Sequence, residues 1–286
     1  ILDNAKSFKE VSSRDVKKVP ALRGKTVVNL FFEDSTRTRM SFELAAKRLS
    51  ADVINFAAKT SSLSKGETML DTLQTIESYS TDIFVVRHSE STAPLYLSLN
   101  TEASIVNAGD GQNEHPTQAL LDMYTVREKL GTLSGLNVAI IGDITHSRVA
   151  RSNIWGFSKF GSEVTVCGPS TLIPKFFESM PCKISYDLPE TLKKADVVIM
   201  LRIQRERQKD IFFPSDQEYG KYFSLNQDSV KNLSKKAIVL HPGPVNWDKE
   251  IDSSLKERCQ PIILDQVNNG LAVRMAVLYL LRGEKI

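Results

Sequence analysis

The sequence predicts an α/β protein with two doubly wound parallel-sheet domains and a cleft between them. Short apolar runs rich in β-branched residues alternate with segments of helical periodicity along most of the 286 residues. Strands that alternate with helices pair into parallel sheets, and helices cover both faces of such sheets. The alternation stops near residues 130–136, where Gly131 ends a helix, and then starts again. Two such runs predict two domains.

In the first run, β-rich apolar stretches predict the strands, and apolar residues at three- and four-residue steps predict the helices. The expected order is strand 25–32, helix 40–49, strand 53–56, helix 67–79, strand 82–86, short helix 94–99, strand 104–107 and helix 117–130. Residues 1–6 read as the end of a helix, so we expect further residues upstream of Ile1.

The second run predicts strand 137–141, helix 148–160, strands 163–167, 196–201 and 237–240, and a last amphipathic helix over 270–281. We expect residues 1–131 to form the first domain, with a C-terminal helix over 270–286 packed back on it. Residues 132–269 then form the second domain.

Composition excludes several classes of protein. Lys and Arg number 37 and Asp and Glu number 34, a net charge of +3, which is too balanced for a nucleic-acid binder. No apolar run approaches the ~20 residues of a membrane span. The three cysteines, Cys167, Cys182 and Cys259, are odd in number and form no CxxC pair. We expect buried free thiols, a cytoplasmic location and no metal or organic cofactor.

Ligands of open α/β sheets bind at the carboxyl ends of the strands, so the polar segments there should carry the chemistry. The first strand runs into a segment of three hydroxyls and two guanidinium groups at a helix start: Ser35, Thr36, Arg37, Thr38 and Arg39. Helix N-terminal N–H groups and arginine favour phosphate. An ordinary N-cap with a solvated turn is the alternative, and five such residues after a buried strand favour the anion site.

Two later strand ends of the first run are also polar. One ends at Arg87-His88, and the other leads through Gly109-Asp110-Gly111 to His115-Pro116-Thr117-Gln118. The imidazole and the amide of the last segment could donate hydrogen bonds to a polarised carbonyl. Alone, His-Pro is usually a turn, with the histidine in a structural role. The segment 61–68, rich in serine, is by itself best explained as a capped loop before a helix.

In the second run, Gly142-Asp143 follows a strand but lacks the G-x-G-x-x-G fingerprint, so a dinucleotide site is disfavoured. Arg148, at the next helix start, is better placed for a ligand carboxylate. The segments 202–207 and 241–245 follow two further strands. A solvated charged turn is the alternative for the first, and a rigid proline loop is the alternative for the second.

Together these segments resemble the aspartate/ornithine carbamoyltransferase family across nearly the whole chain. The matching motifs, in order, are Phe-x-x-Ser-Thr-Arg-Thr-Arg at 32–39, Lys-Gly-Glu-Thr at 65–68, Arg87-His88, the segment 109–118, Gly142-Asp143 with Ser147-Arg148-Val149, and His-Pro-Gly-Pro at 241–244. The pattern Arg-x-Gln-x-Glu-Arg at 202–207 resembles the aspartate branch. The Ser-Met-Gly and His-Cys-Leu-Pro segments expected of an ornithine enzyme are absent from the sequence.

The resemblance implies a role for each matching residue. Ser35, Thr36, Arg37 and Thr38 would bind the phosphate of carbamoyl phosphate. Its carbonyl oxygen would be held by Thr38, Arg87 and His115, and its amide by Gln118 and the backbone at Gly243 and Pro244. Aspartate would be bound by Lys65, Arg148, Arg202 and Gln204, with Arg148 and Arg202 on its two carboxylates. Arg37, Thr38, Arg87, His115 and Lys65 would be the catalytic set.

The resemblance also implies a homotrimer, because Ser62 and Lys65 would reach in from a neighbouring subunit. Regulatory chains or other enzymes of pyrimidine biosynthesis are possible further partners. The sequence departs from the family at Asp34, commonly proline, and at Trp247, often arginine in bacterial relatives. Neither position is a ligand in this scheme. A carbamoyltransferase for ornithine or a related amine, an NAD-dependent dehydrogenase and a non-catalytic paralogue are the alternatives.

Overall fold

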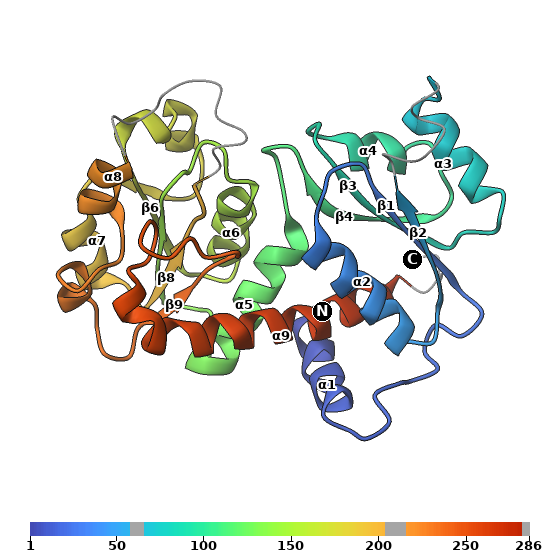
Figure 1. Ribbon diagram of the computed structural model, residues 1–286, viewed down its shortest axis with the longest axis horizontal. Helices are drawn as coiled ribbons and strands as arrows, with labels where there is room; N and C mark the ends of the chain where they lie inside the picture. The colour runs from blue at the N-terminus through green and yellow to red at the C-terminus, as the bar shows by residue number, and fades with distance from the viewer. Residues whose placement is uncertain (58–65, 204–215, 282–286) are drawn as a thin grey trace. The chain divides into compact units, whose positions relative to one another are not determined.

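A computed structural model describes residues 1–57, 66–203 and 216–281. The chain forms two compact units, one made of Ile1–Leu120 with Asn268–Ile286 and the other of Leu121–Val267. Each unit contains one parallel sheet flanked by helices (Figure 1). The predicted fold class, α/β with two parallel sheets, is therefore confirmed. Helices α5 (Pro116–Leu130) and α9 (Lys256–Leu280) contribute residues to both units.

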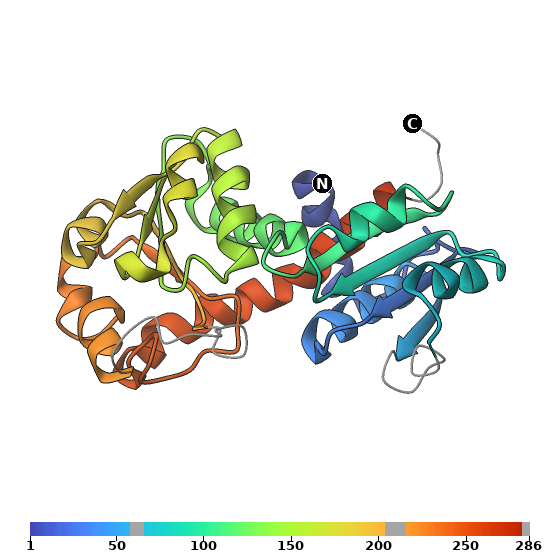
Figure 2. The ribbon, with the colours of Figure 1, turned by 90° about the horizontal axis from the view of Figure 1, so that it is seen from above.

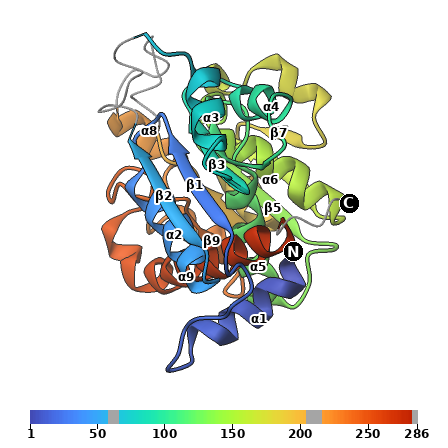
Figure 3. The ribbon, with the colours of Figure 1, turned by 90° about the vertical axis from the view of Figure 1, so that its right-hand side faces the viewer.

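The first unit has a four-stranded sheet in the order β2-β1-β3-β4, and every adjacent pair is parallel. Its elements are α1 Leu2–Ser12, β1 Thr26–Phe31, α2 Thr36–Arg48, β2 Asp52–Ala57, α3 Met69–Glu77, β3 Ile83–His88, α4 Ala93–Ser98 and β4 Ser104–Asp110. Figure 3 shows α2 on one face of this sheet and α3 and α4 on the other.

Alternation of side chains along β1 explains how the first sheet is covered. Val28 and Leu30 point to one face and pack with Leu73 of α3 and Leu97 of α4. Asn29 points the opposite way, is fully buried, and donates from Nδ2 to Oδ1 of Asn55 at 2.8 Å. The two asparagines are register partners on β1 and β2, so the buried amide nitrogen of Asn29 finds its acceptor within the sheet.

The second unit has a five-stranded sheet in the order β7-β6-β5-β8-β9, again parallel throughout. Its elements are β5 Asn137–Ile141, α6 Arg148–Lys159, β6 Glu163–Cys167, β7 Lys183–Ser185, α7 Leu188–Lys194, β8 Val197–Met200, α8 Asp216–Phe223 and β9 Ile238–Leu240. Short 3₁₀ helices lie at Ser170–Leu172, Lys175–Ser179, Ser229–Asn232 and Ser253–Leu255.

One face of the second sheet packs against α7 and the beginning of α9 through a single apolar cluster. Ile141 and Met200 of the sheet share this cluster with Leu192 of α7 and with Cys259 and Ile263 of α9. Helix α6 lies on the opposite face (Figure 2). Both faces of the sheet are therefore buried, as the near-continuous apolar strands predict.

The strand order of each sheet reverses at one point, and ligands of open α/β sheets bind beside such a reversal. In the first sheet the chain goes from β1 to β2 on one side and then crosses to β3 on the other. In the second sheet it runs from β5 through β6 to β7 and then returns to β8. The expected ligand positions are therefore the carboxyl ends of β1 and β3, and those of β5 and β8.

The predicted element bounds differ most at α9. The sequence predicts a helix over 270–281, but α9 begins at Lys256. Pro261 lies inside this helix, which hides its true start from the sequence pattern. Leu271–Leu278 is buried on nearly every side, so this part lacks the amphipathic pattern of a surface helix. The short elements β7, α7 and α8 are missing from the sequence prediction. Within the residues that the structure covers, no helix is long and apolar enough to cross a membrane.

The packing of α6 generates a stability prediction. Phe157 is fully buried against the second sheet, whereas Phe160, three residues later, is about half exposed at 48%. Phe157→Ala removes a ring from a closed core and should lower the free energy of unfolding by about 3–5 kcal/mol. The matched change Phe160→Ala should alter it by no more than about 0.5 kcal/mol. Urea unfolding followed by fluorescence measures both, and equal losses would contradict this assignment of the core.

Candidate functional site

The polar segment after β1 forms the first turn of α2, at the first expected ligand position. Ser35 is the N-cap, and the helix begins at Thr36. No acidic residue lies in this first turn, and the Ser35 side chain does not cap the helix. Thr36 and Arg37 are exposed, whereas Thr38 is buried. Because the first N–H groups of a helix have no acceptor within it, this turn is suited to bind an anion.

Arg87 lies beside this turn, in register with Phe31 at the carboxyl end of the neighbouring strand β3. Its side chain is mostly buried and is fixed from two directions. Its Nε lies 3.3 Å from Oε2 of Glu33, and its Nη1 donates to the carbonyl oxygen of Ala108 at 3.2 Å. Glu33 was not among the predicted site residues, although it follows β1 directly. It holds a guanidinium group at the strand end.

His88, the next residue, has a different environment. Burial lowers its pKa, its ring lies 5.0 Å from that of Phe32, and its Nδ1 accepts a hydrogen bond from the N–H of Glu90 at 2.9 Å. The imidazole is therefore neutral at pH 7, because its ordinary pKa already lies below that value. The positive charge at this strand end comes from Arg87.

His115 and Gln118 lie together at the start of α5. Both are buried, with 5% and 8% of their surface exposed. The N–H of Gln118 donates to the carbonyl oxygen of His115 at 3.0 Å, which makes His115 the residue from which the helix begins. An imidazole at a helix N-terminus is favoured in its neutral form, because the positive end of the helix dipole disfavours imidazolium.

In the second unit, the turn after β5 leads directly to Arg148, the first residue of α6. Arg148 is 3% exposed, and Ser147 caps the helix by accepting from the N–H of Ala150 at 3.2 Å. Gly142 has φ +128°, and a Cβ there would come within 2.9 Å of the Tyr219 hydroxyl oxygen. This turn requires glycine for close packing within the unit.

Arg202 follows β8, the second strand at the reversal of this sheet, and is partly buried. The next N–H, of Ile203, donates to Oε1 of Glu250 at 3.1 Å. Glu250 is fully buried and also accepts from the backbone and the side-chain amide of Asn246 at 2.7 and 2.8 Å. Burial raises its pKa, but the neighbouring His241 ring and the hydrogen bonds from Asn246 and the Ile203 N–H outweigh burial and lower the pKa overall. An ionised carboxylate therefore ties the segment after β8 to the segment after β9.

The His-Pro-Gly-Pro segment after β9 is held by its own histidine. The N–H of Gly243 donates to Nδ1 of His241 at 2.8 Å, so the neutral ring carries its proton on Nε2. That nitrogen lies 3.6 Å from Oε2 of Glu250. The peptide bond between Gly243 and Pro244 is cis. The N–H of His241 donates to Oε1 of Gln266 at 3.1 Å, and these contacts fix the backbone at the two predicted ligand positions.

Three predicted site residues, Ser62, Lys65 and Gln204, lie outside the described residues. The others are divided between the two units. Ser35, Thr36, Arg37, Thr38, Arg87, His115 and Gln118 lie in the first unit, and Arg148, Arg202, Gly243 and Pro244 lie in the second. Asp34 is exposed beside the α2 start, and Trp247 packs against the apolar cluster of the second unit, with Lys256 Nζ 5.8 Å from its ring centre.

The three thiols are unsuited to nucleophilic catalysis. Burial raises the pKa of Cys167 and of Cys182 to about 11, and it also raises the pKa of Cys259. Cys167 and Cys259 are buried as expected, whereas Cys182 is partly exposed. At pH 7 all three are thiols, and the thiolate is the reactive form. Among the described residues, no three or more His, Cys, Asp or Glu side chains are grouped so that they could hold a metal ion.

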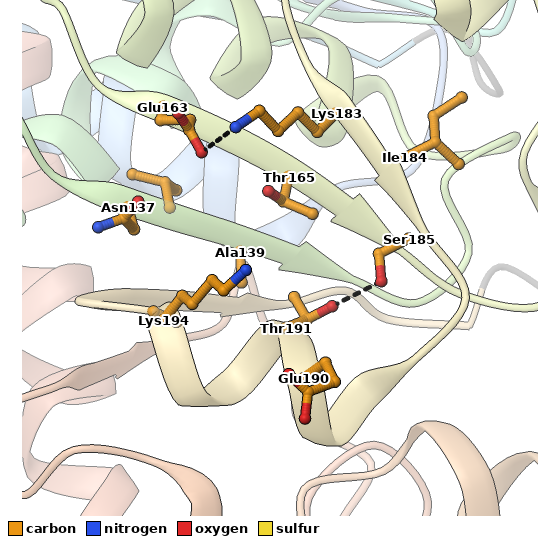
Figure 4. A pocket seen from close by; sticks show the side chains of 12 residues that line it. Asn137, Ala139, Glu163, Thr165, Lys183, Ile184, Ser185, Glu190, Thr191 and Lys194 are labelled. Carbon is orange, nitrogen blue, oxygen red and sulfur yellow. Dashed lines mark hydrogen bonds and ion pairs between the residues drawn. The ribbon is translucent and has the colours of Figure 1, made fainter.

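A hollow of about 200 Å³ lies elsewhere in the second unit, between α7 and the sheet (Figure 4). Its lining includes the first residues of three strands, Asn137, Glu163 and Lys183. Figure 4 shows Lys183 paired with Glu163 and Thr191 bonded to Ser185 across it. The hollow therefore lies toward the amino ends of the strands, and none of the predicted site residues lines it.

Comparison with known proteins identifies one family along nearly the whole chain. Two family models match: the carbamoyl-P binding domain of aspartate/ornithine carbamoyltransferase over residues 1–128, and its Asp/Orn binding domain over residues 134–281. An aspartate carbamoyltransferase catalytic subunit of Halothermothrix orenii is 55% identical over 100% of this chain and 91% of its own length. One of Thermobifida fusca is 53% identical over the same shares.

Solved structures agree. The catalytic subunit of M. jannaschii aspartate transcarbamoylase superposes with a TM-score of 0.85 at 34% identity, covering 99% of this chain and 93% of the other. The Trypanosoma cruzi enzyme in complex with carbamoyl phosphate and aspartate gives a TM-score of 0.86 at 30% identity, with 97% and 90% covered. From its sequence, its two sheets and the residues at their strand ends, the chain belongs to the aspartate/ornithine carbamoyltransferase family.

Proposed function

We propose that this chain transfers the carbamoyl group of carbamoyl phosphate to the amine of L-aspartate, giving N-carbamoyl-L-aspartate and phosphate, as a step of de novo pyrimidine biosynthesis. The observation that carries the proposal is its 53–55% identity, over nearly its whole length, to proteins named aspartate carbamoyltransferase catalytic subunit. The residues at the strand ends of both sheets support it.

Carbamoyl phosphate binds to the first unit. Ser35, Thr36, Arg37 and Thr38 offer hydroxyls, a guanidinium group and helix N–H groups to the phosphate. Arg87, already held by Glu33 and Ala108, donates to the carbonyl oxygen. Because its other contacts fix the guanidinium group in advance, little reorganisation is needed when the ligand binds.

The reaction is an acyl transfer. The neutral amine of aspartate attacks the carbamoyl carbon, and negative charge develops on the carbonyl oxygen. Arg87, His115 and Thr38 stabilise that oxyanion by hydrogen bonding. The tetrahedral species collapses as the carbon–oxygen bond to phosphate breaks, the amine loses a proton, and phosphate leaves. Gln118 and the backbone at Gly243 and Pro244 orient the carbamoyl amide, and rate comes from positioning and oxyanion stabilisation.

Arg148 and Arg202 in the second unit, with Gln204, bind the two carboxylates of aspartate. Two cationic side chains after the central strands β5 and β8 suit a dicarboxylate. The same charges disfavour ornithine, whose side chain ends in an ammonium group. A dehydrogenase is disfavoured because the turn after β5 lacks the glycine fingerprint.

The active unit is a homotrimer in which Ser62 and Lys65 reach the site of a neighbouring subunit. A closed three-fold ring uses one head-to-tail contact three times, so every subunit both gives a loop and receives one. We also place the enzyme in the cytoplasm, with regulatory chains or other pyrimidine-pathway enzymes as candidate partners.

Acceptor choice is the direct test. With carbamoyl phosphate, the protein should carbamoylate aspartate and should leave ornithine unchanged.

Arg202→Ala should raise the apparent KM for aspartate by at least about tenfold, because a charge-assisted hydrogen bond is worth ~1.5–3 kcal/mol. Its effect on carbamoyl phosphate should be smaller. Arg151→Ala on α6 is the control and should leave KM near wild type, because the Arg151 guanidinium lies 5.5 Å from the ring centre of Phe176. An unchanged aspartate KM in Arg202→Ala, with weakened carbamoyl phosphate binding, would reverse the assignment of the two units.

The role of His115 is tested by two substitutions. His115→Asn keeps a hydrogen-bond donor and should retain part of the activity, whereas His115→Ala should lose more, up to about 10²–10³ in kcat. Steady-state kinetics with both substrates separates the variants. A covalent carbamoyl-enzyme, trapped and mapped to His115, would show that His115 acts as a nucleophile and not as a hydrogen-bond donor.

Mixed trimers test the shared site. Lys65→Ala and Arg148→Ala trimers should each be nearly inactive. When the two are unfolded together and reassembled at random, a site is intact if its own chain keeps Arg148 and its neighbour keeps Lys65. Roughly a quarter of the sites meet this condition in a closed ring. Activity should return to about that fraction, with the wild-type KM for aspartate. If mass measurement shows mixed trimers that stay inactive, Lys65 acts within its own chain.

A further inference from the structure

In the first unit, the buried carboxylate of Asp110 accepts four hydrogen bonds. Asp110 is the last residue of β4 and is 1% exposed. Its Oδ1 accepts from Nδ2 of Asn107 at 2.8 Å and from the N–H of Glu114 at 3.1 Å. Its Oδ2 accepts from the N–H of Thr92 at 2.6 Å and from Nδ2 of Asn113 at 3.0 Å. Each oxygen therefore serves two donors.

These four donors come from different parts of the unit. Asn107 belongs to β4 itself, Thr92 is the N-cap of α4 in the loop after β3, and Asn113 and Glu114 belong to the turn before α5. The backbone adds a further contact, since the N–H of Asp110 donates to the carbonyl oxygen of Glu114 at 3.1 Å. One charged group thus fixes the loops after two neighbouring strands.

Glycine makes this close approach possible. Gly111 has φ +48°, and a Cβ at this position would lie 2.6 Å from the Ser91 hydroxyl oxygen and 2.8 Å from the Ser91 backbone nitrogen. The N–H of Gly111 donates to the carbonyl oxygen of His88 at 3.0 Å. The loop after β3 therefore lies directly against the turn after β4. A side chain at position 111 would push the two apart.

The residue that follows Glu114 is His115, from whose carbonyl α5 begins. The backbone of Glu114 is bound through both its N–H and its C=O to Asp110, so the path of the chain into His115 is set by that carboxylate. We propose that Asp110 is a positioning residue for the reaction, which fixes the His115 imidazole relative to Arg87 through the turn 110–114. The inference rests on the oxyanion role given above to His115.

A comparison within the same sheet separates positioning from general stabilisation. Asp82 lies at the amino end of β3, where its carboxylate accepts from the N–H of Thr26 at 2.8 Å and pairs with Nζ of Lys25 at 2.8 Å. It likewise joins neighbouring strands through charge-assisted hydrogen bonds. Ligands bind at the opposite end of such a sheet. Asp82 is therefore a matched control.

The experiment compares Asp110→Asn with Asp82→Asn. Asparagine has the shape of aspartate but only one acceptor oxygen, so two of the four donors at position 110 would face an NH₂ group. Both variants should melt at a lower temperature than wild type. Only Asp110→Asn should lower kcat, by about 10²-fold, because a displacement of about 1 Å in a catalytic group has that effect. Its KM for aspartate should stay near wild type.

NMR of the four histidine rings gives a readout that does not depend on turnover. Asp110→Asn should shift the His115 signal and leave those of His146 and His241, which lie in the second unit, in place. If Asp110→Asn changes kcat and the His115 signal no more than Asp82→Asn does, the positioning role is wrong. If instead wild type fails to carbamoylate aspartate, the proposed function fails, and the NMR comparison still decides whether Asp110 places His115.

Should Asp110→Asn not fold, Asn113→Ala replaces it. This change removes one of the four donors and leaves the carboxylate in place. It should lower kcat by a smaller factor and shift the His115 signal in the same direction. Wild-type kinetics together with an unmoved His115 signal would overturn the proposal.

Discussion

Parallel strand pairing is the constraint on which the rest of this molecule depends. In each sheet all strands run the same way, so their carboxyl ends meet at one edge, and the order reverses once, between β1 and β3 in the first unit and between β5 and β8 in the second. Arg87 lies at the end of β3, Arg148 and Arg202 follow β5 and β8, and the α2 turn with Arg37 follows β1. Residues far apart in sequence, such as Arg37 and Arg87, come to one edge because the topology allows no other placement.

Three carboxylates then convert this placement into fixed geometry. Glu33 holds the guanidinium of Arg87, Asp110 joins the loops after β3 and β4, and Glu250 joins the segments after β8 and β9. Asp110 and Glu250 are buried, which would be costly for a lone charge, and hydrogen bonds from backbone and side-chain donors offset that cost. An enzyme that binds two anions needs its cations in position before the ligands arrive, and Glu33 holds Arg87 in this way.

Sequence patterns were sufficient for the fold class, for most strands and for the segments that hold the candidate residues, because buried parallel strands are continuous apolar runs. They failed at α9, whose start carries Pro261 and whose end is buried all round. They also missed β7 and α7, which are only a few residues long. Glu33 and Glu250 could not be found in this way, since their partners Arg87 and Ile203 are distant in sequence.

The order of the chain has a consequence for synthesis on the ribosome. The second unit is one continuous segment, Leu121–Val267, whereas the first needs Asn268–Ile286, which is synthesised after that segment. This later segment supplies Arg274, whose Nη1 donates to the Ser41 hydroxyl at 2.9 Å and whose guanidinium lies over the ring of Phe42. Tyr279 adds an edge contact to Phe8. Although its strands emerge first, the N-terminal unit keeps an open core until this later segment has been synthesised, so the second unit is the first able to fold completely.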